Sequence, residues 1–232
     1  MAKKVKDNQG DKNLGNIESA LSKTELFIED NQKMLTNILF GVLVVVLAVI
    51  AGNRYVLKPK NAEAASSMYM AERYFEKDSF NLALQGYGTY PGFIDIIDDY
   101  GITKSAKLAR IYAGICYKEV GDYESAIEYL SKFKTRDLMI GSVAKSALGD
   151  AYTELEDYDK AIKAYLDGAN NYPNDFTSPI ILKKAGLVYE SMGEYEKALG
   201  IYERISADYP ATAEGREMKK YIGRVEALIA AV

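Results

Sequence analysis

The sequence predicts an all-α protein in which one membrane-spanning helix precedes an α-solenoid built from repeated pairs of helices. Two observations carry this prediction. The first is a phrase of a small residue, Gly, two variable residues and Tyr, which occurs three times with its glycine at Gly114, Gly149 and Gly186. The second is residues 34–53, an apolar stretch without a charged side chain.

The repeated phrase has the chemistry of two helices packed closely together. Its glycine lets a second helix approach the first, and its tyrosine fills the space between helices. A later alanine in each copy stands at the crossing, where a larger side chain would overpack the contact. These tyrosines and alanines are Tyr117, Tyr152, Tyr189, Ala126, Ala161 and Ala198. We therefore expect scaffold positions here, and no contact with a ligand.

A period of about 35 residues with this phrase and a closing Tyr-Pro pair is typical of tetratricopeptide repeats. The sequence thus predicts a tetratricopeptide-repeat α-solenoid within residues 61–232, with a C-terminal capping helix. We place the repeats at about 64–100, 107–138, 142–173 and 179–210, and the capping helix at 211–232. Such repeats form surfaces that bind other proteins.

The first repeat departs from the pattern because it is longer than the others. The extra residues lie between Tyr90 and Gly101, where Phe93, Ile96 and Ile97 have helical spacing. This spacing predicts a short helix that packs its apolar face against the solenoid.

The region before the repeats predicts a retained membrane anchor. Residues 1–20 are polar and predict a disordered cytoplasmic tail, residues 21–35 a juxtamembrane helix, and residues 36–57 the transmembrane helix. Lysines cluster before the span, which favours a cytoplasmic N-terminus. Pro59 is expected to end the span, with Asn61 as the N-cap of the following helix.

Small residues one helical turn apart, Ala48 and Gly52, would let the span pack against a partner helix. The lipid bilayer is thus one expected contact of the chain, through a single helix.

The first helices of the repeats predict a concave groove that binds protein partners. We expect this surface at Leu108, Ile111, Ile115, Val143, Asp150, Ile180, Lys183 and Leu187. Its aliphatic residues would bind an extended or helical hydrophobic segment, and Asp at Ile111 and Leu187 would then weaken binding without unfolding the protein. Alternatively, neighbouring repeats or the C-terminal helix cover these side chains.

Composition argues against several other classes of function. The net charge of −4 gives no basic surface for nucleic acid. Histidine is absent, and no phosphate loop, metal cluster or activated nucleophile is recognisable, so we expect no enzyme, no catalytic or metal-binding residues, no cofactor and no small-molecule substrate. The single cysteine, Cys116, is expected to be a buried, inert thiol.

The flanks of the span carry a family resemblance. The segments Phe27–Lys33 and Gly52–Tyr55 resemble the YfgM-type ancillary subunit of the Sec translocon, and Gly92–Gly101 and Asn174–Pro179 are similar to the version of this family in Bacteroidota. The resemblance implies an inner-membrane protein with a periplasmic repeat domain. It also implies SecYEG and a PpiD-like membrane-anchored periplasmic chaperone as partners, and no catalytic residues.

The resemblance therefore implies a translocon-associated scaffold or chaperone adaptor. A structural adaptor of cell-envelope or outer-membrane protein assembly, not tied to the translocon, remains the alternative.

Overall fold

The computed structural model describes residues 27–231. The chain divides into two units between Lys58 and Pro59. The predicted tail, residues 1–20, lies outside the described residues. Of the predicted juxtamembrane helix, residues 21–35, the first six residues, 21–26, also lie outside them.

The first unit is helical and exposes its apolar side chains. Its main helix, α2, runs Gln32–Gly52 and is followed by a π-helical turn, η1, at Asn53–Leu57. No residue of α2 is buried. Within the described residues, the helical run Gln32–Phe75 is the one whose length and composition would allow it to cross a membrane. Length and composition alone make it a candidate span.

Pro59 does not break the helix, so this expectation was wrong. The helical run continues to Phe75. A proline ring in an α-helix clashes with the carbonyl four residues earlier, which here belongs to Tyr55. Tyr55 lies in the π-helical turn, where the Lys58 N–H donates to the Asn53 carbonyl five residues back. The wider turn shifts these carbonyls out of α-helical register and gives the ring room.

Asn61 is likewise inside a helix and does not cap the one it was expected to begin. Its Oδ1 accepts a hydrogen bond from the Lys104 N–H at 2.8 Å. Asn61 therefore satisfies a backbone donor at the start of the next repeat.

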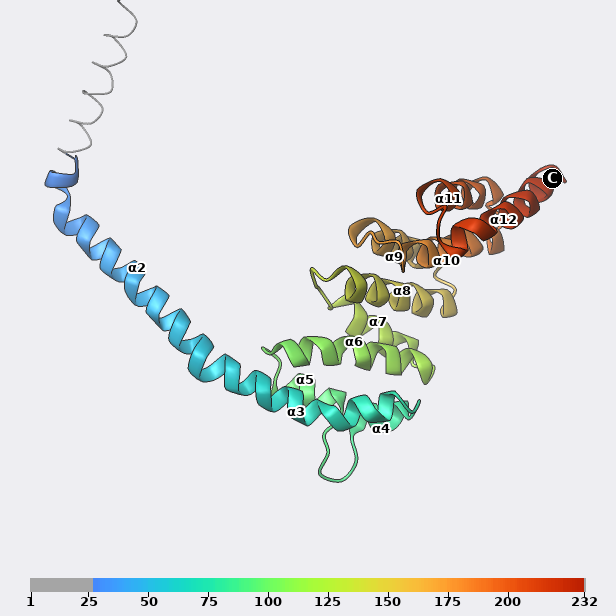
Figure 1. Cartoon of the computed structure of the whole chain (residues 1–232). Helices are drawn as coiled ribbons and strands as arrows, with labels where there is room; N and C mark the ends of the chain where they lie inside the picture. The colour runs from blue at the N-terminus through green and yellow to red at the C-terminus, as the bar shows by residue number, and fades with distance from the viewer. Residues whose placement is uncertain (1–26, 232) are drawn as a thin grey trace, which may run out of the picture. The chain divides into compact units, whose positions relative to one another are not determined.

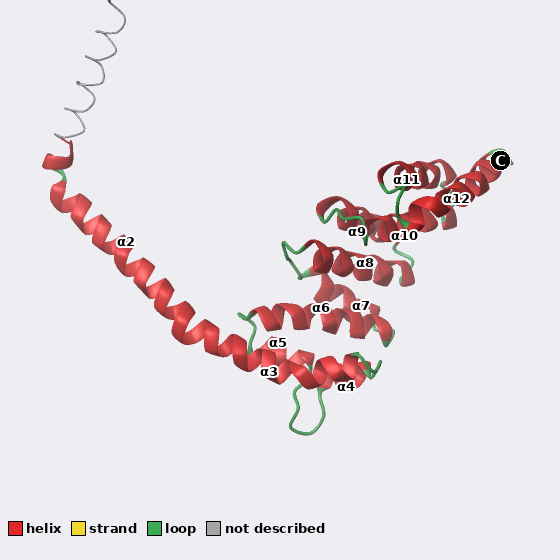
Figure 2. Ribbon diagram, viewed as in Figure 1, coloured by secondary structure: helices red, strands yellow, loops and turns green. Residues whose placement is uncertain are grey.

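The second unit is a stack of helices without a strand among its described residues (Figure 2). Its helices are α3 Lys58–Phe75, α4 Phe80–Gln85, α5 Phe93–Asp99, α6 Lys104–Glu119, α7 Tyr123–Ser131, α8 Leu138–Glu154, α9 Tyr158–Asn171, α10 Ser178–Ser191, α11 Tyr195–Asp208 and α12 Ala213–Ile229. The pairs α6–α7, α8–α9 and α10–α11 each pack together, and α6, α8 and α10 also contact one another in order (Figure 1). The predicted fold class is confirmed.

The repeated phrase sets the register of each pair. A Cβ atom at Gly149 would overlap the ring of Tyr165 on α9, and one at Gly186 would overlap the ring of Tyr202 on α11. The crossing alanines, Ala126, Ala161 and Ala198, have no exposed surface. Small residues at these positions are therefore required by the closeness of the two helices.

In the first repeat, two short helices take the place of one long second helix. Between α4 and α5 a loop turns back on itself, with Tyr87 and Tyr90 exchanging backbone hydrogen bonds of 3.0 and 3.1 Å. The expected short helix is confirmed in α5, whose apolar face is buried. Phe93 in this helix stacks on Tyr112 of α6 with ring centroids 5.0 Å apart.

The helix α12 closes the end of the stack. Met218 and Val225 are buried in a cluster with Tyr202 and Ile205 of α11. Because a solenoid otherwise ends on an open apolar face, this contact is what a capping helix provides.

Candidate partner-binding groove

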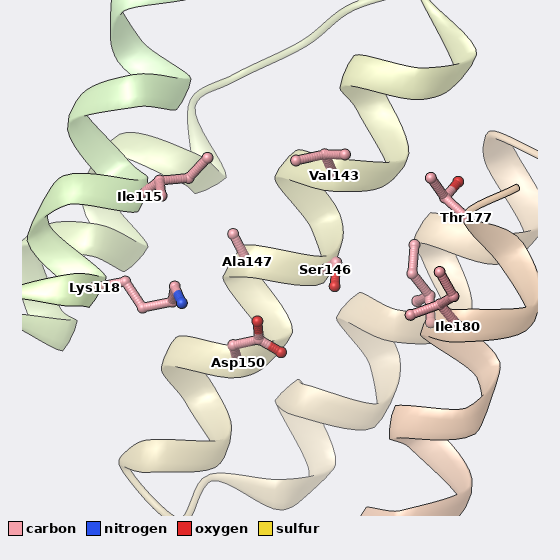
Figure 3. A pocket seen from close by; sticks show the side chains of 9 residues that line it. Ile115, Lys118, Val143, Ser146, Ala147, Asp150, Thr177 and Ile180 are labelled. Atoms are coloured by element: carbon pink, nitrogen blue, oxygen red, sulfur yellow. The ribbon is translucent and has the colours of Figure 1, made fainter. Parts of the chain in front are cut away.

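The first helices of three repeats line a groove of about 290 Å³ (Figure 3). The lining residues are Ile115 and Lys118 of α6; Val143, Ser146, Ala147 and Asp150 of α8; and Thr177, Ile180 and Ile181 at and after the start of α10. On α8, positions three and four residues apart share one helix face, which explains why these side chains point the same way.

The wall of the groove is aliphatic and open to solvent. Val143 is 41% exposed and Ile180 is 40% exposed. Ala147 and Ile181 are buried and form the floor. An apolar hollow rimmed by polar groups is the usual form of a surface that binds another apolar group.

The structure brings four of the predicted groove residues together, namely Ile115, Val143, Asp150 and Ile180. Ile111 is different, because it is only 4% exposed and belongs to the core shared by α6, α7 and α8. The expectation that Asp at Ile111 leaves the fold intact was therefore wrong, since it would bury an unpaired carboxylate. Leu108 is half-buried and packs against the cores of both the first and second repeats.

Lys183 and Leu187 lie on α10 outside the groove. The ammonium of Lys183 pairs with Glu217 at 3.0 Å and lies 4.7 Å from the ring centroid of Tyr221, both on α12. The capping helix thus engages the charge of Lys183, which was expected to face a partner. Leu187 is 42% exposed but does not line the groove.

Thr177 is a groove residue that the repeat pattern did not indicate, because it precedes the helix whose positions were counted. Its Oγ1 lies 2.6 Å from the buried Ser142 Oγ of α8 and accepts a hydrogen bond from Asn174 Nδ2 at 2.7 Å. The spacing of Asn174 and Thr177 before an apolar run is a signal of a helix start that could have placed it.

The charged groups of the groove are neutralised within the protein. Lys184 Nζ lies 2.7 and 2.8 Å from the two carboxylate oxygens of Asp150, and the Tyr165 hydroxyl donates to Asp150 at 2.8 Å. Burial and this carboxylate raise the pKa of Tyr165 above its ordinary value. Lys118 is paired with Glu119. These contacts join α8 to α9 and α10 and leave the groove without a strong charge of its own.

A second, polar hollow of about 340 Å³ adjoins the groove and shares Lys118 and Asp150 with it. Its other lining residues are Glu119, Tyr123, Thr153, Glu154 and Tyr165. Thr153 and Glu154 lie in the last turn of α8, so this polar hollow extends the groove toward the end of that helix.

Cys116 is a buried thiol in α6, facing away from any solvent. Burial, and secondarily the charge of Glu119, raises the pKa of Cys116 to about 12. Since the thiolate is the reactive form, a thiol with this pKa is inert at neutral pH. Among residues 27–231, no three His, Cys, Asp or Glu side chains are placed to hold a metal ion.

We expect Cys116 of the folded chain to resist iodoacetamide at pH 8 and to react once urea exposes it. A Ser131→Cys variant, which adds an exposed thiol on α7, is the control and should be labelled in the folded protein. Mass spectrometry of the alkylated chain measures both sites. Labelling of Cys116 at the rate of the added cysteine would contradict its burial.

Comparison with known proteins supports the repeat fold. Residues 144–175 and residues 184–212 each match a family model described as tetratricopeptide repeat. A crystal structure of MamA protein is 22% identical and covers 72% of this chain and 88% of its own, with a TM-score of 0.52. Another crystal structure of MamA is 22% identical and covers 69% of this chain and 95% of its own, with a TM-score of 0.48.

No curated protein sequence matches this chain. At 22% identity, the likeness to MamA protein concerns the fold. Together with the two matched segments, it shows that this chain contains tetratricopeptide repeats and folds them into a tetratricopeptide-repeat solenoid.

Proposed function

We propose that the protein is a membrane-anchored scaffold that binds segments of other proteins in the groove of α6, α8 and α10 and catalyses no reaction. The observation that carries this proposal is the solvent-open aliphatic wall at Val143 and Ile180 within a tetratricopeptide-repeat fold. Tetratricopeptide repeats present concave surfaces of this kind to protein partners. Burying two aliphatic side chains supplies the apolar part of such an interaction.

The anchor in this proposal is α2. Its apolar side chains are exposed along its length, which suits a helix surrounded by lipid. Ala48 and Gly52 lie one turn apart, and nothing lies within 4 Å of the place where Gly52 would carry a Cβ. This small-residue face is the proposed contact with a partner's membrane helix.

A more specific form of this proposal, the finer assignment, places the repeat domain in the periplasm, with SecYEG and a PpiD-like chaperone as partners. It is supported by the sequence around the span, in Phe27–Lys33 and Gly52–Tyr55, which resembles that of the ancillary translocon subunits. In this assignment the groove receives a polypeptide or a chaperone segment close to the membrane.

Site-specific photo-crosslinking of the full chain in its native membrane tests the function. A photoreactive residue is placed at Val143, at Ile180 or at Ala48, with Glu203 on the exposed face of α11 as the control position. We expect protein adducts from the groove and the span, and none specific to Glu203. Adducts that contain translocon components support the finer assignment, whereas adducts with other envelope proteins alone favour the envelope adaptor.

A double substitution, Val143→Asp with Ile180→Asp, tests whether the groove itself binds. Both side chains are exposed, so the fold should persist while the apolar contact is lost. Only about two-fifths of each side chain remains for a ligand to bury, so the lost contact is worth about 1 kcal/mol for each and should lower binding by about tenfold or more. Crosslinking from Ser146, on the groove side of α8, and circular dichroism measure binding and folding separately. Undiminished adducts from a folded variant would move the binding site elsewhere.

A further inference from the structure

We propose that the groove selects extended segments in which a lysine or arginine stands three residues from an apolar side chain. This inference rests on the proposed function, because it names the class of segment that the groove binds. It follows from the pairing of an apolar groove with an acidic polar hollow along the same helix.

The apolar end of the site is the groove itself. Val143 and Ile180 form its open wall, with Ile115 half-buried beside them. The polar groups there are already satisfied, since Asp150 is paired with Lys184 and with Tyr165. A ligand group in this part is therefore best apolar, because a charged one would find no open partner.

The polar hollow differs from the apolar groove, because the carboxylate of Glu154 has no cationic partner among the described residues and can pair with a ligand. Glu119 is paired with Lys118, and Asp150 with Lys184. Glu154 accepts a hydrogen bond from the Tyr123 hydroxyl at 3.3 Å, and within residues 27–231 it forms no ion pair. A cationic side chain of a partner would complement this surplus negative charge.

The spacing of the two parts sets the separation of the apolar and the basic side chain in an extended ligand. Ala147 on the groove floor and Glu154 in the polar hollow are seven residues apart on α8, which corresponds to about 10 Å at 1.5 Å per residue. An extended chain advances about 3.3 Å per residue, so a basic residue three positions from an apolar one spans this distance. A helical ligand would cover less than half of it with the same spacing.

Three peptides test this inference with the full chain in lipid nanodiscs. The first is fluorescein-labelled Gly-Lys-Ser-Ser-Leu-Leu-Ser-Ser-Lys-Gly, in which each leucine has a lysine three positions away in one direction. The others carry Gln or Glu in place of both lysines. Having lysine on both sides makes the result independent of the direction in which the peptide lies. Fluorescence anisotropy at low salt measures the dissociation constants.

We expect the Lys peptide to bind about two- to five-fold more tightly than the Gln peptide, which is the range of an exposed ion pair. The Glu peptide should bind more weakly than both. The preference should disappear in Glu154→Gln and reverse in Glu154→Lys, while Glu203→Gln, the same charge change on α11, should leave it unchanged. High salt should reduce the preference, because exposed charges are screened.

The outcomes separate this inference from the proposed function. If all three peptides bind equally and Val143→Asp with Ile180→Asp abolishes that binding, the groove binds apolar segments and the basic preference is wrong. If a preference for lysine persists in Glu154→Gln, the charge is recognised elsewhere and the inference is also wrong. If none of the peptides binds, both proposals fail.

Discussion

Replacing Ala161 with tryptophan will lower the free energy of unfolding of the repeat domain by about 3 kcal/mol, at the upper end of the usual cost of overpacking. Ala161 has no exposed surface and lies in a core with Tyr165 of its own helix and Ile181 of α10. The Tyr165 ring already fills the space against Gly149, so no room for an indole remains between α8 and α9. Thermal unfolding by circular dichroism should show a fall in Tm of about 6 to 12 °C.

The matched control for this substitution is Lys163→Trp, on the exposed face of the same helix. It introduces the same side chain without entering the core, so Tm should change little. Ala198→Trp in the next repeat should reproduce the effect of Ala161→Trp, because Ala198 is equally buried at the equivalent crossing. A Tm of Ala161→Trp equal to that of the parent chain would contradict the close packing of these pairs.

Two arginines on one face of α2, Leu43→Arg and Leu47→Arg, will release the full chain from the membrane. Both leucines are exposed, so no protein contact would shelter the new charges. An arginine near the centre of a span costs about 2.5 to 3.5 kcal/mol, and two should exceed about 5 kcal/mol. Alkaline carbonate extraction followed by immunoblotting measures the fraction of the chain that remains with lipid.

The control for this experiment is Leu43→Ala with Leu47→Ala, which shortens the same side chains and adds no charge. This variant should remain in the membrane pellet. If the double-arginine variant also remains there after extraction, α2 does not anchor the chain, and the membrane part of the proposed function fails.

The elements that could be predicted are those that depend on residues close together in the sequence. Gly149 and Ala161 recur at fixed spacing because each repeat solves the same packing problem, so their roles follow from the period. The short helix α5 follows in the same way from the spacing of its apolar residues. The prediction that Pro59 ends the helix was wrong because the effect of this proline depends on the π-helical turn just before it. No residue pattern predicts that turn.

The candidate site was only partly predictable, because the exposure of a side chain depends on helices that are distant in the sequence. Ile111 and Val143 are both aliphatic residues counted onto the same concave surface, yet Ile111 is buried and Val143 is open. The helices α7 and α8 pack over Ile111, whereas Val143, which lies on α8 itself, is left open to solvent. Lys183 was expected in the groove but is held by Glu217 and Tyr221 of the capping helix.

The all-α class, the register of the repeats and the apolar character of the candidate span follow from the sequence alone, because periodicity and hydropathy act over a few helical turns. The packing of the helices in three dimensions determines which concave side chains are open and which charges are already paired. Asp150 is neutralised by Lys184 of the next repeat, whereas Glu154 of the same helix is left without an ionic partner among the described residues. Such pairing depends on distances between separate helices, and those distances are set by the packing of the whole stack.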